Sequence, residues 1–230
     1  MDWNLELRER TGINFLATKP AEIEKKSFEI IKRELGEEFL ASYPEKQLPL
    51  LLRVIHTTAD FSYKDSLFLS DGAMEAGWNA IKAGLPIVTD TTMAASGINK
   101  AAAVRLGISV HCFIGDEDVK KAAAESGMTR SAASVDKAAR LMPDCIYAVG
   151  NAPTALMRLY ELTMEKKIRP ALVIGMPVGF VNVEEAKELI LRLHVPCIVG
   201  RGRKGGSNVA AAVCNALLYS LPSSGDFPGA

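Results

Sequence analysis

Short apolar runs alternate along the chain with longer segments of helical periodicity. The apolar runs that predict β-strands are residues 51–57, 85–90, 108–114, 145–151, 171–177 and 196–202. The segments that predict amphipathic helices, because their apolar residues recur every three to four positions, are residues 66–83, 94–106, 130–141, 154–166 and 182–193. Several runs are apolar throughout, as strands covered on both faces should be. The alternation predicts an α/β fold: a three-layer sandwich with a mainly parallel sheet and helices on both faces.

No low-complexity linker interrupts this pattern, so we expect a single domain over residues 1–230. The final segment LPSSGDFPGA, residues 221–230, is rich in Pro, Gly and Ser. We expect a loose tail there, because such segments bury little apolar surface.

Composition and charge narrow the classes of partner. Hydrophobic residues make up 48% of the chain and charged residues 23%, which is typical of globular proteins. Lys and Arg together number 27, as do Asp and Glu, so the formal net charge is zero and we expect no nucleic-acid partner. No apolar run approaches the roughly 20 residues that cross a bilayer, and the N-terminal MDWNLELRER lacks the apolar centre of a secretory signal. We therefore expect no membrane partner.

The four cysteines, Cys112, Cys145, Cys197 and Cys214, are far apart and form no C-x-x-C motif. Because three of them lie in apolar runs, we expect buried thiols in a reducing cytoplasm and neither disulfides nor metal ligands. The sequence also contains no H-x-x-x-H or H-E-x-x-H motif, so we expect no metal site.

Small, polar and glycine residues follow five of the six predicted strands. These segments are HTTAD at 56–60, TDTTMAASG at 89–97, GNAPT at 150–154, GMPVGF at 175–180 and GRGRKGGS at 200–207. Strand-to-helix loops favour such residues on conformational grounds alone. Five in succession nevertheless indicate one broad ligand site, because ligands of open α/β sheets bind at the carboxyl ends of the strands.

The last of these loops contains G-x-G-x-x-G at Gly200, Gly202 and Gly205, the spacing of the dinucleotide fingerprint. That fingerprint normally sits in the first βαβ unit and needs an acidic residue at the end of the next strand. Here only a helix and a tail follow, and Asp226 lies among Pro and Gly with no strand to hold it. NAD is therefore disfavoured as a ligand.

The same loop is equipped to bind an anion of another kind. Its glycines expose backbone N–H groups, and the helix that follows presents its positive end. Arg201, Arg203 and Lys204 add cations, and an arginine can bind a carboxylate or a phosphate through two hydrogen bonds. The sequence leaves the type of anion open.

The three histidines differ in their surroundings. His111 lies within an apolar run and His194 at the end of a predicted helix, and we expect both to be structural. His56 ends the first predicted strand and begins a polar loop, which places it at the ligand edge. Histidine changes its charge near neutral pH, and no nucleophile motif lies nearby, so acid–base catalysis is the natural role. Position alone leaves a structural role equally open.

Ser27 interrupts an apolar helical stripe formed by Ile23, Ile31 and Leu35. Its hydroxyl could bond back to the carbonyl of Ile23 in the preceding turn. Alternatively, it could face a polar group such as a ligand. The stripe itself does not decide between these two interpretations.

Several motifs together resemble those of the precorrin-8X methylmutase family of cobalamin biosynthesis. They are VIHTTADF, SGINK, TRSAAS, GNAPTAL, IGMPVGFVNVEEAKELI and VGRGRKGGSNVAAA, in this order, and the resemblance covers residues 23–218. The form HTTADF is more similar to the anaerobic, cobalt-precorrin-8 branch. The resemblance implies an isomerase without a cofactor of its own that moves a methyl group from carbon eleven to carbon twelve of the corrinoid ring and yields cobyrinic or hydrogenobyrinic acid. Any cobalt would be carried by the substrate.

The resemblance also implies a homodimer with its active site near the interface. It assigns the catalytic role to His56 and substrate contacts to Ser27 and to Arg130 of the T-R-S motif. The other candidate substrate-binding residues lie in the strand-end loops: Thr91, Met93, Asn151, Thr154, Arg201, Gly205, Gly206 and Ser207. A large ring with carboxylates on its rim would need such dispersed anion-binding groups. The glycine loop would then hold ring carboxylates and not a pyrophosphate.

Two other classes of protein fit parts of the pattern. A nucleotide-dependent α/β enzyme would need an acidic ribose-binding residue, which the sequence does not place. A noncatalytic corrinoid carrier would keep the anion-binding loops but would not need His56.

Overall fold

The computed structural model describes residues 3–221. Its helices are α1 (Trp3–Thr11), α2 (Pro20–Leu35), α3 (Glu37–Ser42), α4 (Leu48–Thr58), α5 (Tyr63–Ser66), α6 (Ala73–Lys82), α7 (Thr92–Gly97), α8 (Lys100–Arg105), α9 (Glu117–Ser126), α10 (Arg130–Leu141), α11 (Pro153–Met164), α12 (Val183–Leu191) and α13 (Ser207–Tyr219). Its strands are β1 (Leu67–Leu69), β2 (Ile87–Thr89), β3 (Val110–His111), β4 (Ile146–Val149), β5 (Leu172–Gly175) and β6 (Cys197–Gly200).

The six strands form one sheet in the order β1-β6-β5-β4-β2-β3. The pairs among β2 to β6 are all parallel, whereas β1 pairs with β6 in the antiparallel direction. The chain places β3 on one side of β2 and β4 on the other. The carboxyl ends of β2 and β4 therefore flank the topological switch point, where open α/β sheets bind their ligands.

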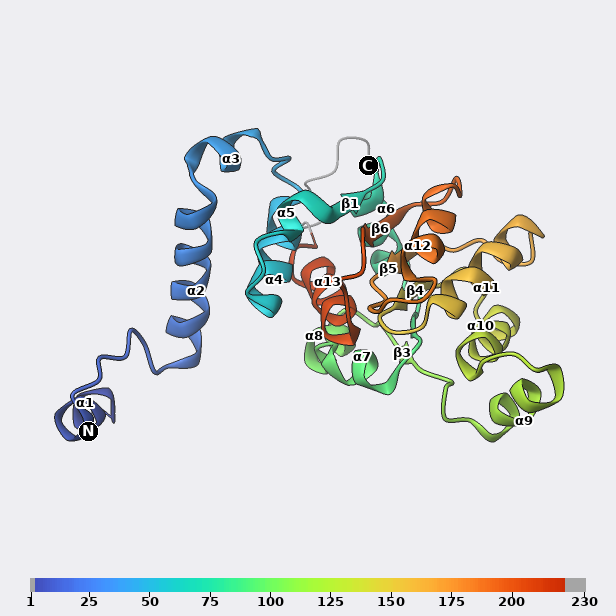
Figure 1. Ribbon diagram of the computed structural model, residues 1–230, viewed down its shortest axis with the longest axis horizontal. Helices are drawn as coiled ribbons and strands as arrows, with labels where there is room; N and C mark the ends of the chain where they lie inside the picture. Colours follow the sequence, from blue (N-terminus) through green and yellow to red (C-terminus); the bar gives the residue numbers. More distant parts are fainter. Residues whose placement is uncertain (1–2, 222–230) are drawn as a thin grey trace.

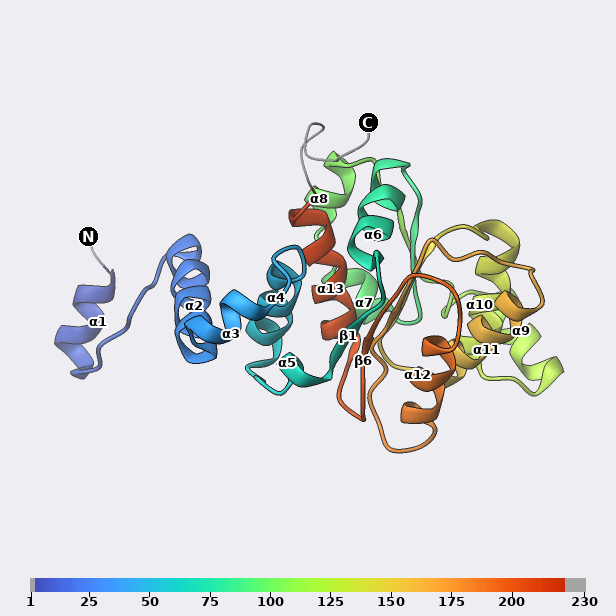
Figure 2. The ribbon, with the colours of Figure 1, turned by 90° about the horizontal axis from the view of Figure 1, so that it is seen from above.

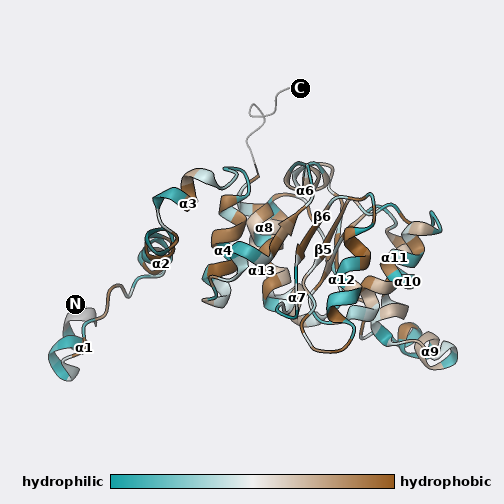
Figure 3. Ribbon diagram, turned by 45° about the horizontal axis from the view of Figure 1, so that its top comes forward, coloured by the Kyte–Doolittle hydropathy of each residue, from teal (hydrophilic) through white to brown (hydrophobic). Residues whose placement is uncertain are grey.

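Helices cover both faces of this sheet, as the sequence predicts (Figures 1 and 2). Ile146, Leu172 and Ile198 belong to a core shared with α4, α6, α8 and α13. The next residues along two of these strands, Tyr147 and Val173, belong to a second core with α10, α11 and α12. Because successive strand residues point to opposite faces, continuously apolar strands fill both cores. Figure 3 shows the hydrophobic colouring of β5 and β6 between the helical layers.

The N-terminal helices extend away from the sandwich and contact it through α2, which packs on α4. Figures 1 and 2 show α1 and α2 as an arm that reaches beyond α4. Only Ile31 of α2 is buried, whereas Trp3, Ile13, Leu16 and Ile23 are all more than two-fifths exposed. The arm thus presents apolar side chains without a covering layer in the described chain.

The prediction of a strand at residues 51–57 is wrong, because these residues lie in helix α4. The run from Leu50 to Ile55 is almost wholly apolar, and such a run fits a buried helix as well as a buried strand. Pro49 stands in the first turn, where proline suits a helix, and Ala59 ends the helix in a left-handed conformation with φ of 53°. His56 accordingly lies in the last turn of a helix and not at the end of a strand.

Other boundaries also differ from the sequence prediction. The segment 66–83 contains the short strand β1 before α6, and 94–106 is divided between α7 and α8. Within 108–114, only Val110 and His111 form a strand. The helices predicted at 130–141, 154–166 and 182–193 are present as α10, α11 and α12. The predicted tail lies outside the described residues except for Leu221, which packs against the first core.

All four cysteines have free thiols. Cys145, Cys197 and Cys214 are buried, as the sequence predicts, whereas Cys112 is only half-buried. Burial raises the pKa of the Cys145 and Cys214 thiols to about 12. Within residues 3–221, no helix has the length and apolar character needed to cross a membrane.

Candidate active site

Ser27 and His56 form a hydrogen-bonded pair between helices α2 and α4. The Ser27 Oγ lies 2.7 Å from the His56 Nδ1. The serine that interrupts the apolar stripe of α2 thus meets the histidine in the last turn of α4. Whichever atom donates, the bond occupies Nδ1, and the other ring nitrogen, Nε2, has no hydrogen-bond partner in the described part of the chain.

Further contacts hold α2 against α4 and fix the orientation of the imidazole. The Phe28 ring packs against the His56 ring with 5.2 Å between their centroids. The guanidinium of Arg53, one turn before His56, lies 5.0 Å from the Phe28 centroid, and its Nη1 is 2.6 Å from the Glu24 Oε1. The pair therefore lies on a defined helix–helix contact and not on a loop.

The Ser27–His56 pair lines a cavity of about 470 Å³. The cavity lies between the segment 14–17, helix α2 and the end of α4. Its walls are mainly apolar and include Phe15, Ile30 and Phe61. Pockets that bind small molecules are mostly apolar with a small number of placed polar groups, and this cavity has that character.

A second group of predicted site residues meets at the switch point of the sheet. Asp90 follows β2 and is 4% exposed. Its carboxylate accepts hydrogen bonds from the backbone N–H groups of Gly150, Asn151 and Ala152, at 2.8–2.9 Å. Burial raises the pKa of Asp90, although these three donors act in the opposite direction. The carboxylate fixes the loop after β4 and with it the exposed side chain of Asn151.

The loop after β6 packs directly on the same region. The Thr91 Oγ1 lies 2.7 Å from the Ser207 Oγ and also accepts from the Ala94 N–H at the start of α7. A Cβ added to Gly150 would lie 2.6 Å from the Ser207 Cα, so the two backbones need glycine there. The structure therefore brings Thr91, Asn151 and Ser207 together, as the sequence predicts.

The three cations of the glycine loop have different environments. The Lys204 Nζ lies 2.6 Å from the Asp60 Oδ2, and the Arg203 Nε lies 2.8 Å from the Glu184 Oε1. The Arg201 guanidinium lies 4.6 Å from the Phe68 centroid, and no carboxylate in the described chain pairs with it. Arg201 is thus the cation of this loop that is free to bind an anion.

The Asp60–Lys204 ion pair also connects the two groups of site residues. Asp60 lies just after α4, which carries His56, and Lys204 lies in the glycine loop. The Lys204 ammonium, together with Ser62, lowers the pKa of the Asp60 carboxyl. A continuous path of contacts thereby runs from the end of α4 to the glycine loop and on to the switch point.

Thr154 lies further along this edge, beside the start of α10. Its Oγ1 is 2.8 Å from the Oγ1 of Thr129, which caps α10. Arg130 follows as the first residue of α10 and is exposed, as is Met93 at the start of α7. None of the contacts among residues 3–221 joins Arg130 or Arg201 to the Ser27–His56 pair, so in one chain the predicted site consists of two groups of residues.

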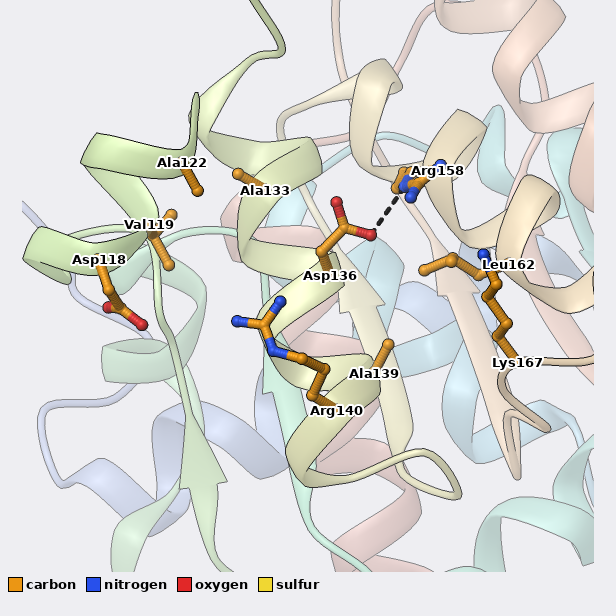
Figure 4. Close-up of a pocket in the computed structure, with 10 residues that line it drawn as sticks. All are labelled: Asp118, Val119, Ala122, Ala133, Asp136, Ala139, Arg140, Arg158, Leu162 and Lys167. Carbon is orange, nitrogen blue, oxygen red and sulfur yellow. Dashed lines mark hydrogen bonds and ion pairs between the residues drawn. The ribbon is translucent and has the colours of Figure 1, made fainter. Parts of the chain in front are cut away.

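A second cavity, of about 480 Å³, lies between α9, α10 and α11 (Figure 4). Arg140 and Lys167 line it from the C-terminal ends of α10 and α11, which places them away from the strand-end loops. Its other arginine, Arg158, lies 2.8 Å from the Asp136 Oδ1 (Figure 4). None of the site residues that the sequence predicts lines this cavity.

Sequence reasoning missed three charged residues that contact the strand-end loops: Asp60, Asp90 and Lys187, whose Nζ donates to the carbonyls of Gly202 and Lys204. Asp90 follows a buried strand, and this position was a usable signal. Lys187 is 1% exposed and shares the buried side of α12 with Val183, Ala186 and Ile190. A lysine at one position of an otherwise apolar i, i+3, i+4 and i+7 stripe is the sequence pattern that could have indicated a buried charge. Asp60 carries no comparable signal, because its partner Lys204 is remote in sequence.

The described residues contain no group of three or more His, Cys, Asp or Glu side chains arranged to hold a metal ion.

These features define an open α/β protein with polar loops at the carboxyl ends of its strands and a hydrogen-bonded serine–histidine pair at the wall of an apolar cavity. Comparison with known proteins identifies the family. The family model for precorrin-8X methylmutase matches residues 22–220. The cobalt-precorrin-8 methylmutase of Priestia megaterium is 40% identical over 220 residues, covering 96% of each chain, and that of Salmonella typhimurium is 44% identical over 207 residues, covering 88% of this chain and 96% of its own.

A solved structure extends the similarity to three dimensions. The precorrin-8x methyl mutase from Thermus thermophilus superimposes with a TM-score of 0.77 at 41% sequence identity, covering 86% of this chain and 96% of its own. The chain therefore belongs to the precorrin-8X methylmutase family, a family of isomerases in cobalamin biosynthesis.

Proposed function

We propose that the protein converts precorrin-8, or its cobalt complex, into hydrogenobyrinic or cobyrinic acid by moving a methyl group from carbon eleven to carbon twelve of the ring. The bond from the methyl group to carbon eleven breaks as the bond to carbon twelve forms, and the molecular formula does not change. The observation that carries the proposal is the Ser27–His56 pair at the wall of an apolar cavity in a chain of this family.

His56 is the proton donor and acceptor in this proposal. A proton delivered from Nε2 to the conjugated ring would withdraw electrons from the carbon that receives the methyl group, to which the methyl group then moves with the electron pair of its bond to carbon eleven. The same proton must leave the ring again, since the product is an isomer of the substrate. Ser27 holds Nδ1 at 2.7 Å and thereby orients Nε2. General acid catalysis of this type contributes about 10²–10⁴-fold.

The remaining site residues suit the shape and charge of a corrinoid. Met93, Val178, Phe180 and Val181 expose between 46% and 84% of their surface near the strand-end loops, which offers an apolar area for the ring. Groups able to bind the carboxylates around its rim are Arg130, Arg201, Asn151, Thr154 and the backbone of Gly205 and Gly206, with Thr91 and Ser207 fixing the loops. Holding one ring conformer lowers the barrier to a rearrangement within the molecule.

We propose that the protein is a homodimer whose active site lies near the subunit interface. The Ser27–His56 pair and the Arg130 side chain occupy separate parts of one chain's surface. The arm beyond α4 exposes apolar side chains, including Phe15, Leu16 and Ile23, as a surface that a second copy covers would do. A partner seated there would complete the cavity beside His56.

Three further assignments accompany this proposal. The chain forms a single methylmutase domain, which the family match over residues 22–220 supports. It acts in the cytoplasm, where reducing conditions suit its four free cysteines. It uses no cofactor of its own, and the cobalt-precorrin-8 branch is favoured by its HTTADF motif.

The test is turnover of precorrin-8 carrying an isotope-labelled methyl group on carbon eleven. The expected product has the mass of the substrate and its label on carbon twelve, as read by NMR, and forms without an added cofactor. Parallel reactions with the metal-free and the cobalt-containing ring assign the branch. Tight binding without movement of the label would contradict the proposal and identify a carrier. Failure to bind either ring would exclude corrinoids as ligands of this protein.

A further inference from the structure

Lys187 is a buried lysine that the proposed reaction does not use. It lies in the middle of α12 and is 1% exposed. Within residues 3–221, no carboxylate lies within ion-pair distance of its ammonium group. Instead, the Nζ donates to the carbonyl oxygens of Gly202 at 2.7 Å and Lys204 at 2.8 Å. Burying an ammonium group without a carboxylate partner lowers stability. A functional role for Lys187 would explain why the fold contains it.

The two hydrogen bonds determine which way the glycine loop presents its backbone. The carbonyls of Gly202 and Lys204 point inward, toward α12. All described peptide bonds are trans, and in a trans peptide the N–H points opposite to the C=O. The N–H groups of Arg203 and Gly205 therefore point away from Lys187, and neither has an acceptor in the described chain.

The end of the loop nearest to α13 is held independently. The Gly206 N–H donates to the Met176 carbonyl at 2.8 Å. A Cβ on Gly205 would collide with the same carbonyl and would lie 2.6 Å from the Pro177 oxygen. Lys187 holds the other part of the loop, between Gly202 and Lys204. Between these two carbonyls, the Arg203 carbonyl accepts a hydrogen bond from the Gly179 N–H at 3.2 Å, and Lys187 supplies the buried donors of this part of the loop.

We propose that Lys187 is a positioning residue for substrate binding. By holding alternate carbonyls inward, it directs the N–H groups of Arg203 and Gly205 outward as a pair of donors for one ring carboxylate. Its positive charge behind the loop adds to the attraction for an anion. This inference rests on the proposed function, because it takes the ligand to be a carboxylate-bearing corrinoid.

The main test compares Lys187→Met with the parent full-length protein. Methionine is unbranched and only one atom shorter than lysine, and it removes the donors and the charge. Affinity for cobyrinic acid is measured by absorbance titration, and KM and kcat are measured with precorrin-8. We expect Kd and KM to rise about tenfold or more, as loss of well-oriented donors to a charged group implies. We expect kcat to stay within about threefold of the parent, because His56 and Ser27 are untouched.

A second probe isolates the carboxylate. When the rim carboxylates of cobyrinic acid are converted to amides, the parent protein should bind the ring more weakly. Lys187→Met should then cause little additional loss, because the ligand group that the loop holds is already absent. A loss as large for the amide ring as for the acid would overturn the proposal.

Two further variants control for folding. Leu159→Ala opens a cavity in the second core, away from the loop, and should reduce stability without changing Kd. Equal effects of Leu159→Ala and Lys187→Met on Kd would show that lost stability explains both. If Lys187→Met does not fold, Lys187→Gln keeps one donor group and should give a smaller rise in Kd. A folded Lys187 variant that binds as the parent does, in a chain that isomerises precorrin-8, would reject this inference alone.

Discussion

The Ser27 Oγ lies 2.7 Å from the Nδ1 of His56, although the two residues belong to different helices and are 29 positions apart. This contact decides between the interpretations that the sequence leaves open for Ser27 and gives His56 a defined partner. The serine that breaks the apolar stripe of α2 does not bond back within its own helix. It engages the ring nitrogen of the only histidine that lines the cavity.

We expect His56→Ala to separate binding from chemistry. The substitution removes the proposed acid but leaves the carboxylate-binding loops intact, so the fold and the affinity for the ring should change little. Turnover should fall by about 10²-fold or more, the usual contribution of general acid catalysis. Single-turnover conversion of precorrin-8, followed by absorbance, measures the rate, and a titration measures binding.

Matched histidine variants serve as controls for this experiment. His111 pairs with the Ser109 Oγ at 2.9 Å and His194 is exposed, so His111→Asn and His194→Asn should turn over nearly as the parent does. A His56→Ala protein that converts the substrate at close to the parent rate would remove His56 from the mechanism.

Ser27→Ala should reduce kcat while leaving substrate affinity nearly unchanged. The loss of one hydrogen bond between α2 and α4 should lower the free energy of unfolding by about 0.5–1.5 kcal/mol. A fall in kcat of about tenfold corresponds to roughly 1.4 kcal/mol of lost transition-state stabilisation. Because Ser27 acts through His56, adding Ser27→Ala to His56→Ala should cost little more. Independent, multiplicative effects in the double variant would show that the serine contacts the substrate separately.

Arg201→Ala should weaken corrinoid binding more than Arg203→Ala does. Arg201 has no carboxylate partner in the described chain, whereas Arg203 pairs with Glu184 at 2.8 Å. A hydrogen bond to a charged group contributes about 1.5–3 kcal/mol, so Kd should rise by roughly 10- to 100-fold. Titration with cobyrinic acid measures both variants. Unchanged affinity in Arg201→Ala would assign this arginine to its contact with Phe68 alone.

The sequence was sufficient to predict the layers of the fold. The continuously apolar runs at 145–151, 171–177 and 196–202 contain β4, β5 and β6, because strands that feed two cores need apolar residues at successive positions. The helix predicted at 130–141 begins and ends at the same residues as α10. Thr129 explains this agreement, since its side chain caps the first turn and marks the start in the sequence.

The error at α4 has a physical cause and affects the argument about His56. A run from Leu50 to Ile55 has no periodicity, because α4 is buried against both α13 and α2. The sequence pattern places His56 at the ligand edge through a strand at residues 51–57, where the structure has helix α4. The structure gives it a different position, next to Ser27, that no local pattern specifies. Contacts between distant segments, such as Asp60 with Lys204, are likewise absent from local sequence patterns.

Asp90→Ala should reduce stability and disturb the switch point together. The substitution leaves three backbone N–H groups, of Gly150, Asn151 and Ala152, without their acceptor. Each buried donor without an acceptor costs about 1–3 kcal/mol, and costs within one network are not fully additive. We expect the free energy of unfolding to fall by roughly 2–4 kcal/mol. Urea unfolding measures this, with the exposed Asp71→Ala as the control.

The stability of the protein should depend on pH through Lys187. Burial lowers the pKa of Lys187 to about 8, whereas a lysine in the unfolded chain has a pKa near ~10.4. Below pH 8 both states carry the proton, and the cost of the buried charge is fully present. Between about pH 8 and 10 the folded state releases the proton first, so the unfolded state binds more protons and the free energy of unfolding rises with pH. The neutral amine keeps donors for both carbonyls.

Lys187→Met has no titratable amine at this position. Comparing it with the parent therefore isolates the contribution of Lys187 to the pH dependence of the free energy of unfolding. Urea unfolding at pH 7, 8, 9 and 10 gives the free energy of unfolding of each protein. The parent-minus-variant difference should increase with pH, by at most about 1.4 kcal/mol for each pH unit. The Cys145 and Cys214 thiols, whose pKa burial raises to about 12, reduce stability at high pH in both proteins and cancel in the difference. A difference that is constant or falls between pH 8 and 10 would show that Lys187 does not carry a destabilised charge behind the glycine loop.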